Sequence, residues 1–373
     1  MFKVNQNNIL EDVMKRIHNF SAGPAVLPLE VLQEVQQDLV DYKGKGLSVM
    51  EMSHRSKDYQ EIFDDATATM KRLLNVGDDY AVLFLGGGAS SQFYMLPLNL
   101  LPDDKIGNYI NTGEWAGKAY KEALKIGKKA HLAATSEDKK FSYLPKTFTL
   151  SENPAYLHYT TNNTIYGTEY HKDLEVPKDL LLVSDMSSDF LSRPIDGNKY
   201  GLIYAGAQKN IGPAGATAVI LRRDLMDKFN KNLPTMMSYK THIDKDSMFN
   251  TPPAFPVYVI GLVLKWIEKQ GLEKVLLNNQ KKAAYIYDAI DNSNGYYKGT
   301  VEKEDRSLMN ITFRLPSEEL EEKFIGEAKK LDMIGLKGHR SVGGCRASTY
   351  NSLPIEATKD LGEFMVDFQK RNG

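Results

Sequence analysis

The sequence predicts an α/β protein: a large domain with a mostly parallel sheet between helices, then a smaller C-terminal α+β domain. Three observations lead to this prediction. Short apolar runs alternate with helical patterns between residues 80 and 221. A break at Asn250-Thr251-Pro252-Pro253 then precedes two helical patterns. In the last third of the chain, short strand patterns are mixed with helices.

Two amphipathic helices are predicted before the sheet. The first begins near Pro28 and ends before Gly44, and the second covers about residues 57–75, with Gly77 beyond its end. The apolar runs that follow fit strands buried on both faces, which is typical of parallel strands in βαβ units. These strands are expected at residues 80–85, 105–111, 155–160, 180–184, 202–205 and 216–221.

The C-terminal third is expected to build the smaller domain. It begins with helices at about residues 256–270 and 272–291, which could bridge to it, and continues with two strands and two further helices. We divide the chain into an N-terminal extension, an N-terminal segment, a large α/β domain and a small C-terminal domain, at residues 1–18, 19–48, 49–267 and 268–373. Residues 1–13 are expected to be peripheral to the fold.

Composition excludes several classes of protein. With 47 Lys and Arg against 48 Asp and Glu, the 373 residues carry a net charge of -1, so no global positive field attracts nucleic acid. The best apolar run, residues 257–264, ends at Lys265 and is too short to cross a membrane. Cys345 is the only cysteine, and a lone thiol favours a reducing compartment, so we expect a cytoplasmic protein.

A glycine-rich loop, GGGASSQ at residues 86–92, lies between a predicted strand and a predicted helix. Its backbone N–H groups and the positive end of the helix could hold a phosphate, although the same glycines also fit a tight turn. The loop lacks the Gly-Lys-[Ser/Thr] of a P-loop, and Ser91 stands where the third glycine of a dinucleotide fingerprint belongs. The loop alone therefore indicates only an anion site.

Two neighbouring strands supply the context for this loop. Asp185 follows one apolar run, and Gln208 and Lys209 come just after the next. Ligands in α/β sheets bind at the carboxyl ends of strands, so these side chains should share one crevice with the glycine loop. A phosphate cradle, an acid and a lysine describe a pyridoxal phosphate pocket, in which the lysine forms a Schiff base and the carboxylate keeps the pyridine nitrogen protonated.

Trp115 and Lys209 each allow a second interpretation. Trp115 follows another strand and could stack on the cofactor ring, but a tryptophan taken alone is more often a core residue. Most lysines are solvated at the surface. Lys209, however, lies between AGA and GPAG, and such small neighbours are unusual around a surface lysine.

From residue 19 to the C-terminus the sequence resembles the phosphoserine aminotransferases, a family of class V, fold-type I pyridoxal phosphate enzymes. The segments that carry this resemblance are NFSAGP at 19–24, MSHR at 52–55, LSRPID at 191–196, AGAQKNIGPAG at 205–215, YKTH at 239–242, FNTPP at 249–253 and GHRSVGGCRAS at 338–348. The resemblance implies the fold-type I architecture, with a sheet of the seven-stranded type.

The resemblance also implies roles for individual residues. Lys209 carries the cofactor, Asp185 pairs with the pyridine nitrogen, Trp115 stacks on the ring and Thr164 contacts its hydroxyl side. The cofactor phosphate is held by Ala89, Ser90 and Gln208, joined by Asn250 and Thr251 from the partner subunit of a homodimer. Two positions depart from some family members, which have arginine at position 90 and serine at position 22.

The substrate expected from this resemblance is doubly anionic. Phosphoserine carries a carboxylate and a phosphate, and arginine side chains suit forked contacts with either group. The candidates are His54, Arg55, His339, Arg340 and Arg346, although basic pairs are usually solvated surface residues. The family pattern implies that Arg340 binds the α-carboxylate or an equivalent anion, and that the other four favour the phosphate end.

The function implied is phosphoserine transamination by a ping-pong mechanism. L-Glutamate would give 2-oxoglutarate, and 3-phosphohydroxypyruvate would give O-phospho-L-serine, in serine biosynthesis and, in some relatives, in pyridoxine biosynthesis. Two alternatives stay open. A cysteine desulfurase would need Cys345 as a mobile catalytic thiol, and a non-catalytic protein would bind pyridoxal phosphate without turnover. No metal site is predicted, because the seven histidines are scattered and no metal-binding motif occurs.

Overall fold

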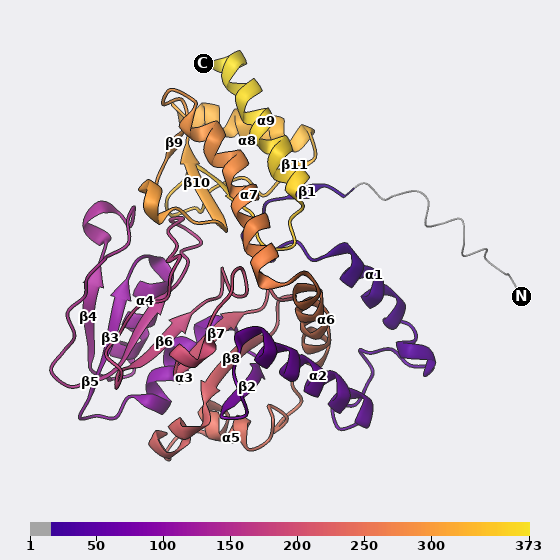
Figure 1. Cartoon of the computed structure of the whole chain (residues 1–373), viewed down its shortest axis with the longest axis vertical. Helices are drawn as coiled ribbons and strands as arrows, with labels where there is room; N and C mark the ends of the chain where they lie inside the picture. The colour runs from indigo at the N-terminus through magenta and orange to yellow at the C-terminus, as the bar shows by residue number, and fades with distance from the viewer. Residues whose placement is uncertain (1–15) are drawn as a thin grey trace, which may run out of the picture.

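A seven-stranded sheet forms the centre of the computed structural model, which describes residues 16–373 (Figure 1). The prediction for residues 1–13, and nearly all of the predicted extension, lies outside this range. The strand order is β2-β8-β7-β6-β5-β3-β4. These strands are β2 (Tyr80–Leu85), β3 (Ile106–Asn111), β4 (Ala130–Thr135), β5 (Pro154–Thr160), β6 (Leu181–Asp185), β7 (Leu202–Gly206) and β8 (Thr217–Arg222).

The sheet is mostly parallel, as predicted. Only β8 among its seven strands runs against its two neighbours, β2 and β7, so the other six strands point the same way. The six predicted strands differ from the observed ones by no more than one residue at either end. The prediction missed β4, an edge strand whose sequence AHLAAT has few strand-favouring residues and whose side chains are mostly half-exposed.

Helices cover both faces of this sheet, and alternate residues of each strand point to opposite faces. Val82 and Phe84 pack in one apolar cluster with α2 (Lys57–Leu74) and α6 (Ala254–Gln270). Leu83 and Leu85 pack in another with the helices of the second face, which are α3 (Gly88–Leu100), α4 (Glu114–Lys125) and α5 (Tyr239–Ile243). Both faces are therefore buried, which explains the continuous apolar runs of the strands.

The helix α2 illustrates how sequence signals set the ends of an element. The Ser56 hydroxyl accepts a hydrogen bond from the backbone N–H of Tyr59, which caps the first turn. Buried side chains such as Phe63 and Met70 recur at helical spacing. The helix ends at Asn75, which has a left-handed conformation with φ of 54°.

The C-terminal part has its own apolar cluster, which includes Phe313 of its small sheet and Phe324, Phe364 and Phe368 of its helices. The sheet is antiparallel, in the order β12-β10-β9, and short β1 pairs with β11. These elements are β1 (His18–Asn19), α7 (Leu272–Asp291), β9 (Lys298–Gly299), β10 (Asn310–Arg314), α8 (Glu318–Lys330), β11 (Met333–Ile334), β12 (Cys345–Ser348) and α9 (Ile355–Asn372).

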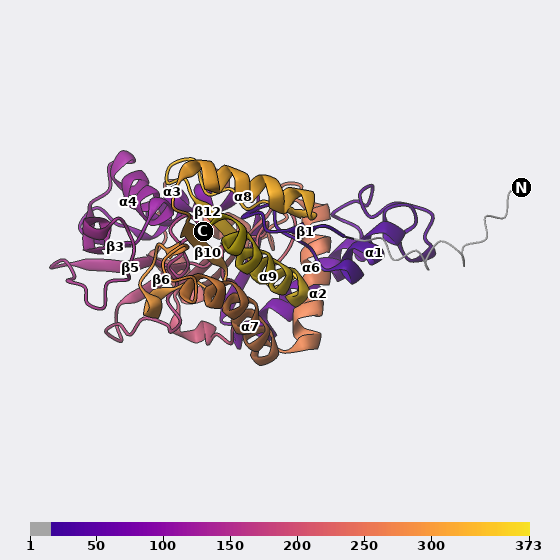
Figure 2. The same ribbon diagram turned by 90° about the horizontal axis from the view of Figure 1, so that it is seen from above.

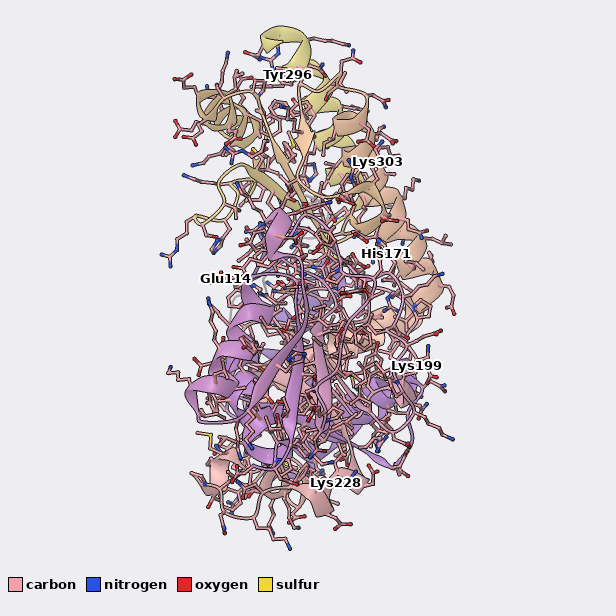
Figure 3. All side chains as sticks on the ribbon, turned by 90° about the vertical axis from the view of Figure 1, so that its left-hand side faces the viewer. Glu114, His171, Lys199, Lys228, Tyr296 and Lys303 are labelled. Carbon is pink, nitrogen blue, oxygen red and sulfur yellow. The ribbon has the colours of Figure 1, made fainter. Side chains whose placement is uncertain are left out.

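The two parts are arranged along the long axis of the molecule. Tyr296 and Lys303 lie towards the end formed by the C-terminal part, and Lys228 lies at the opposite end (Figure 3). The segment with α1 (Leu29–Asp38) projects from the body of the molecule (Figure 2). The domain limits given above remain a prediction. Within residues 16–373, no helix combines the length and apolar character needed to cross a bilayer.

Candidate active site

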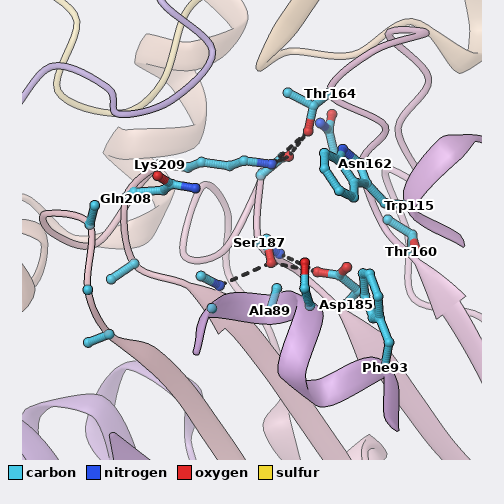
Figure 4. A pocket seen from close by; sticks show the side chains of 18 residues that line it. Ala89, Phe93, Trp115, Thr160, Asn162, Thr164, Asp185, Ser187, Gln208 and Lys209 are labelled. Atoms are coloured by element: carbon cyan, nitrogen blue, oxygen red, sulfur yellow. Dashed lines mark hydrogen bonds between the residues drawn. The ribbon is translucent and has the colours of Figure 1, made fainter. Parts of the chain in front are cut away.

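A pocket of about 230 Å³ opens where the parallel strands end at their carboxyl ends (Figure 4). The loops after five different strands contribute to it, because those strands point the same way and so end at one edge of the sheet. Seven of the predicted site residues line it together: Ala89, Ser90, Trp115, Thr164, Asp185, Gln208 and Lys209. The sequence-based expectation that the glycine loop, the acid and the lysine share one crevice is confirmed.

Lys209 extends from the loop after β7 into this pocket (Figure 4). Its Nζ donates hydrogen bonds to the hydroxyl oxygens of Thr164 at 2.7 Å and Ser188 at 2.8 Å. Burial lowers the pKa of this amine to about 8, and the positive charge of Arg346 acts in the same direction, while Asp185 opposes it. Near neutral pH a useful fraction of the amine is therefore uncharged and nucleophilic.

Asp185 ends β6 and is 3 % exposed. Its Oδ1 accepts two hydrogen bonds from Ser187, from the backbone N–H at 3.0 Å and from the hydroxyl at 2.7 Å. The Ser187 hydroxyl oxygen in turn accepts the backbone N–H of Gly206 on β7. Burial raises the pKa of Asp185, and the Ser187 donors and the charge of Lys209 offset only part of this rise. A cationic partner in the pocket would therefore stabilise the carboxylate.

The amino end of α3 forms the opposite wall. Gly87 precedes the helix with φ of 91°, a left-handed conformation that favours glycine, and an added Cβ would lie 2.1 Å from the Ser91 hydroxyl oxygen. The structure gives no side-chain cap to this helix, so its first N–H groups need another acceptor. Ala89 and Ser90 lie in this first turn and line the pocket. An anion such as phosphate would satisfy these donors.

Two buried polar atoms of the pocket wall lack hydrogen-bond partners among the described residues, as expected where a polar ligand binds. Thr160 Oγ1 and Trp115 Nε1 are buried and have no hydrogen-bond partner among the described residues. Both residues line the pocket, together with the aromatic ring of Phe93. The pocket offers a partner for each group of pyridoxal phosphate. The amine suits the aldehyde, the carboxylate suits the ring nitrogen, the indole can lie beside the ring, and the helix end suits the phosphate. The residues present therefore fit this cofactor.

Arg346 connects this pocket to a second cavity of about 700 Å³. Its Nη1 donates to the backbone oxygen of Thr164 at 3.0 Å, and its buried Nε has no hydrogen-bond partner within residues 16–373. His339 and Arg314 line the same cavity. Burial lowers the pKa of His339, and the neighbouring charges of Arg346 and Arg340 act in the same direction. A substrate anion in this cavity would meet a guanidinium with unused donors.

The remaining predicted residues lie outside these two cavities. Arg55, Arg340, Asn250 and Thr251 are exposed, and His54 is half-buried. The His54 and Arg55 side chains contact each other at 3.4 Å at the turn before α2. One chain therefore gathers the predicted cofactor residues of the sheet edge and the pair Arg346 and His339, but not these five residues.

Sequence reasoning missed the hydroxyl residues that orient the two central groups. Ser187 holds Asp185, and Ser188 holds Lys209 and also bonds the Thr164 hydroxyl at 2.6 Å. Phe93, Thr160 and Asn162 were also missed. The available signal was the sequence DMSSD at 185–189, which places two serines directly after the acid that ends the strand.

Cys345 is a packed residue of β12. It is 1 % exposed, and burial raises the pKa of its thiol. A reactive cysteine needs an accessible thiol with a lowered pKa, and Cys345 has neither property. The structure confirms the interpretation of this residue as a small core side chain.

Comparisons with known proteins agree with the geometry. The family model described as aminotransferase class-V matches residues 17–360. The chain is 55 % identical to the phosphoserine aminotransferase of Desulfosudis oleivorans, over 96 % of this chain and 99 % of that one. It is 52 % identical to the phosphoserine aminotransferase of Geobacillus kaustophilus, with the same coverage.

Solved structures give the same result. The phosphoserine aminotransferase from Bacillus circulans subsp. alkalophilus superposes with a TM-score of 0.94 at 50 % identity, covering 96 % of this chain and 99 % of that one. A phosphoserine aminotransferase from Trichomonas vaginalis, described as PLP bound, gives 0.89 at 38 % identity, with 94 % and 99 % covered. The fold-type I architecture expected from the sequence is thus confirmed.

Proposed function

The chain belongs to the phosphoserine aminotransferase family of the class-V aminotransferases, and from this premise we propose how its residues carry out transamination between L-glutamate and 3-phosphohydroxypyruvate. The products are 2-oxoglutarate and O-phospho-L-serine, which places the reaction in serine biosynthesis. The observation that carries the proposal is the Lys209 amine, which lies in one pocket with Asp185 and the uncapped amino end of α3.

Lys209 is the central residue of the mechanism. When bound, pyridoxal phosphate supplies an aldehyde that condenses with amino groups and a ring that takes up the electron pair released at the substrate Cα. We assign Lys209 Nζ first to holding the cofactor and then, once glutamate has displaced it, to moving the Cα proton. The lowered pKa of this amine leaves part of it unprotonated near neutral pH, so that it can accept this proton. Thr164 and Ser188 keep it inside the pocket.

The other pocket residues orient the cofactor. We assign Asp185 to the pyridine nitrogen, Trp115 to the face of the ring and Thr164 to its hydroxyl side. Ala89, Ser90 and Gln208 lie where the phosphate would meet the amino end of α3. Serine at position 90 offers a hydroxyl and a backbone donor rather than a guanidinium.

The missing part of the site is assigned to a second subunit. We propose a homodimer in which Asn250 and Thr251 of the partner subunit complete the phosphate site. In this chain both residues are exposed and lie outside the pocket. Phe249 beside them is 45 % exposed, and Met50, near His54 and Arg55, is 63 % exposed. These exposed apolar side chains lie beside predicted site residues that are outside the pocket, which supports a subunit interface at this surface.

The substrate anions are assigned to the basic residues. Arg346 is the strongest candidate because its side chain contacts the backbone of Thr164, and Thr164 contacts Lys209. His339 lines the adjoining cavity. His54, Arg55 and Arg340 are proposed to join them once the site is complete, with Arg340 at the α-carboxylate and the others at the phosphate end. The cytoplasm is the proposed location, since the chain has a single, buried thiol.

The alternatives lack support. A cysteine desulfurase needs a mobile, reactive thiol, whereas Cys345 is buried in a strand. A protein that only binds the cofactor would have no need of an amine poised to move a proton. Use of a phosphorylated hydroxythreonine in pyridoxine synthesis stays a proposal by analogy with some relatives.

A coupled assay for 2-oxoglutarate tests the proposed function. With L-glutamate as donor, 3-phosphohydroxypyruvate should give a kcat/KM at least about a hundredfold above that of hydroxypyruvate, because the unphosphorylated acid lacks one of the two paired anions. Comparable values for the two keto acids would contradict the proposed substrate. No 2-oxoglutarate with either acid would contradict the aminotransferase activity itself.

A further inference from the structure

Behind the Asp185 carboxylate, three buried polar side chains lie on one face of the central sheet. Asp185 is paired with Thr160 of β5 on one side and with Tyr204 of β7 on the other. Paired residues of parallel strands share a face, and so do residues two apart on one strand, which adds His158 to this face. His158 is 1 % exposed and Tyr204 is fully buried.

The phenol of Tyr204 lies between His158 and the Asp185 carboxylate. Its hydroxyl lies 2.8 Å from His158 Nε2. Tyr204 is also the residue paired with Asp185 across the sheet, and its side chain lowers the pKa of the Asp185 carboxyl. The other nitrogen of the ring, His158 Nδ1, is buried without a partner in the described part of the chain. The histidine packs against the rings of Tyr109 and Tyr204, with centroids 5.2 Å and 5.9 Å away. Only Nε2 of this imidazole is therefore used.

The number of protons on these side chains sets the direction of the hydrogen bonds that link them. Burial lowers the pKa of His158 to about 3, so the imidazole is neutral and carries one N–H. The phenol has one proton, and an ionised carboxylate can only accept. With Asp185 ionised, Tyr204 must donate to the carboxylate, and His158 Nε2 must donate to the Tyr204 oxygen. Each donor in such a chain polarises the next, which stabilises the carboxylate.

We propose that Tyr204 and His158 are positioning residues, which hold the Asp185 carboxylate ionised and oriented towards the ring nitrogen of the cofactor through this hydrogen-bond chain. The inference rests on the proposed function, because the role of Asp185 at the ring nitrogen is assigned there. Neither residue lines the pocket, so their effect on the cofactor passes through Asp185.

The test compares two ligands on the apoprotein, pyridoxal phosphate and its carbocyclic analogue, in which a C–H group replaces the ring nitrogen. Tyr204→Phe keeps the ring and removes the hydroxyl. It should weaken binding of pyridoxal phosphate about tenfold, the loss typical of one hydrogen bond to a charged group, and leave binding of the analogue within about twofold. His158→Leu should weaken pyridoxal phosphate binding less, and His158→Gln, which keeps a donor, should restore part of it.

Tyr159→Phe is the matched control. Tyr159 is fully buried on the opposite face of β5, and its hydroxyl bonds Tyr200 at 2.9 Å. This variant also loses a buried phenol hydroxyl but should bind both ligands like the parent. Thermal unfolding of all variants reports any general loss of packing.

The outcomes separate the inference from the proposed function. If the parent protein prefers pyridoxal phosphate to the analogue but Tyr204→Phe behaves like Tyr159→Phe, the positioning role is wrong and the proposed function stands. Equal losses for both ligands would also contradict the positioning role. If the parent protein binds both ligands equally, or neither, the assignment of Asp185 fails.

Discussion

The cofactor pocket and the outlying basic segments differ in how completely one chain builds them. In the pocket, Asp185 is buried and Lys209 is half-buried, and each is held by a neighbouring serine hydroxyl. By contrast, Arg55 and Arg340 are exposed in turns, away from the pocket. Asp185 belongs to a paired strand, and the turn that carries Lys209 follows another strand within three residues, whereas Arg55 and Arg340 lie in exposed turns. This difference supports the proposal that one chain preorganises the residues around the cofactor ring, whereas the phosphate and substrate sites need further assembly.

Replacement of Lys209 should have the largest effect. Lys209→Ala removes both the group that holds the cofactor and the group that moves the proton, so turnover should fall by at least about 10⁴-fold. Cofactor should still bind weakly, since the phosphate and ring contacts remain. The coupled assay and equilibrium dialysis measure the two effects. Turnover within tenfold of the parent would refute the role of this residue.

Replacement of Arg346 tests the residue that lies between the cofactor pocket and the adjoining cavity. Arg346→Ala should raise the KM for 3-phosphohydroxypyruvate about ten- to a hundredfold by removing a charge-assisted contact, and should change cofactor affinity much less. Arg371→Ala, on the exposed face of α9, is the control. An unchanged KM would place the anion site elsewhere.

Mixed subunits test whether the exposed segments belong to a neighbouring site. Lys209→Ala subunits are refolded in equal amounts with subunits that carry both Asn250→Ala and Thr251→Ala. If the sites are shared, half of the random dimers contain one intact site, so about a quarter of the parent activity should return at limiting cofactor. Activity no higher than the mean of the two separate variants would contradict sharing.

The pH dependence of cofactor loading gives the smallest and most local test. Only the neutral Lys209 amine attacks an aldehyde, and its pKa lies near 8 rather than at the ordinary lysine value of 10.5. The loading rate should therefore rise with pH to a plateau, with a midpoint near 8. Removing the Arg346 charge should move the midpoint up, and Asp185→Asn should move it down, since Asp185 favours the protonated amine. A midpoint near 10.5 in the parent would mean a solvated amine.

The sequence predicted the sheet well, and it predicted seven residues that the structure brings together in one pocket, for a physical reason. Strands buried on both faces leave continuous apolar runs, and polar residues at or shortly after the end of a run mark its carboxyl end, as do Asp185 and Lys209. It failed at β4, where an edge strand carries little apolar signal, and at Ser187 and Ser188, whose roles depend on side-chain geometry. The direction of β8 depends on strand pairing, which no local pattern specifies. The same holds for the series of polar side chains from Asp185 through Tyr204 to His158.

Covalent trapping tests the central claim most directly. Apoprotein loaded with pyridoxal phosphate is reduced with borohydride, digested and analysed by mass spectrometry. One phosphopyridoxyl group should be found on the peptide that contains Lys209, and Lys209→Ala should carry none there. Labelling of a different lysine, or no stable adduct in the parent protein, would contradict the account.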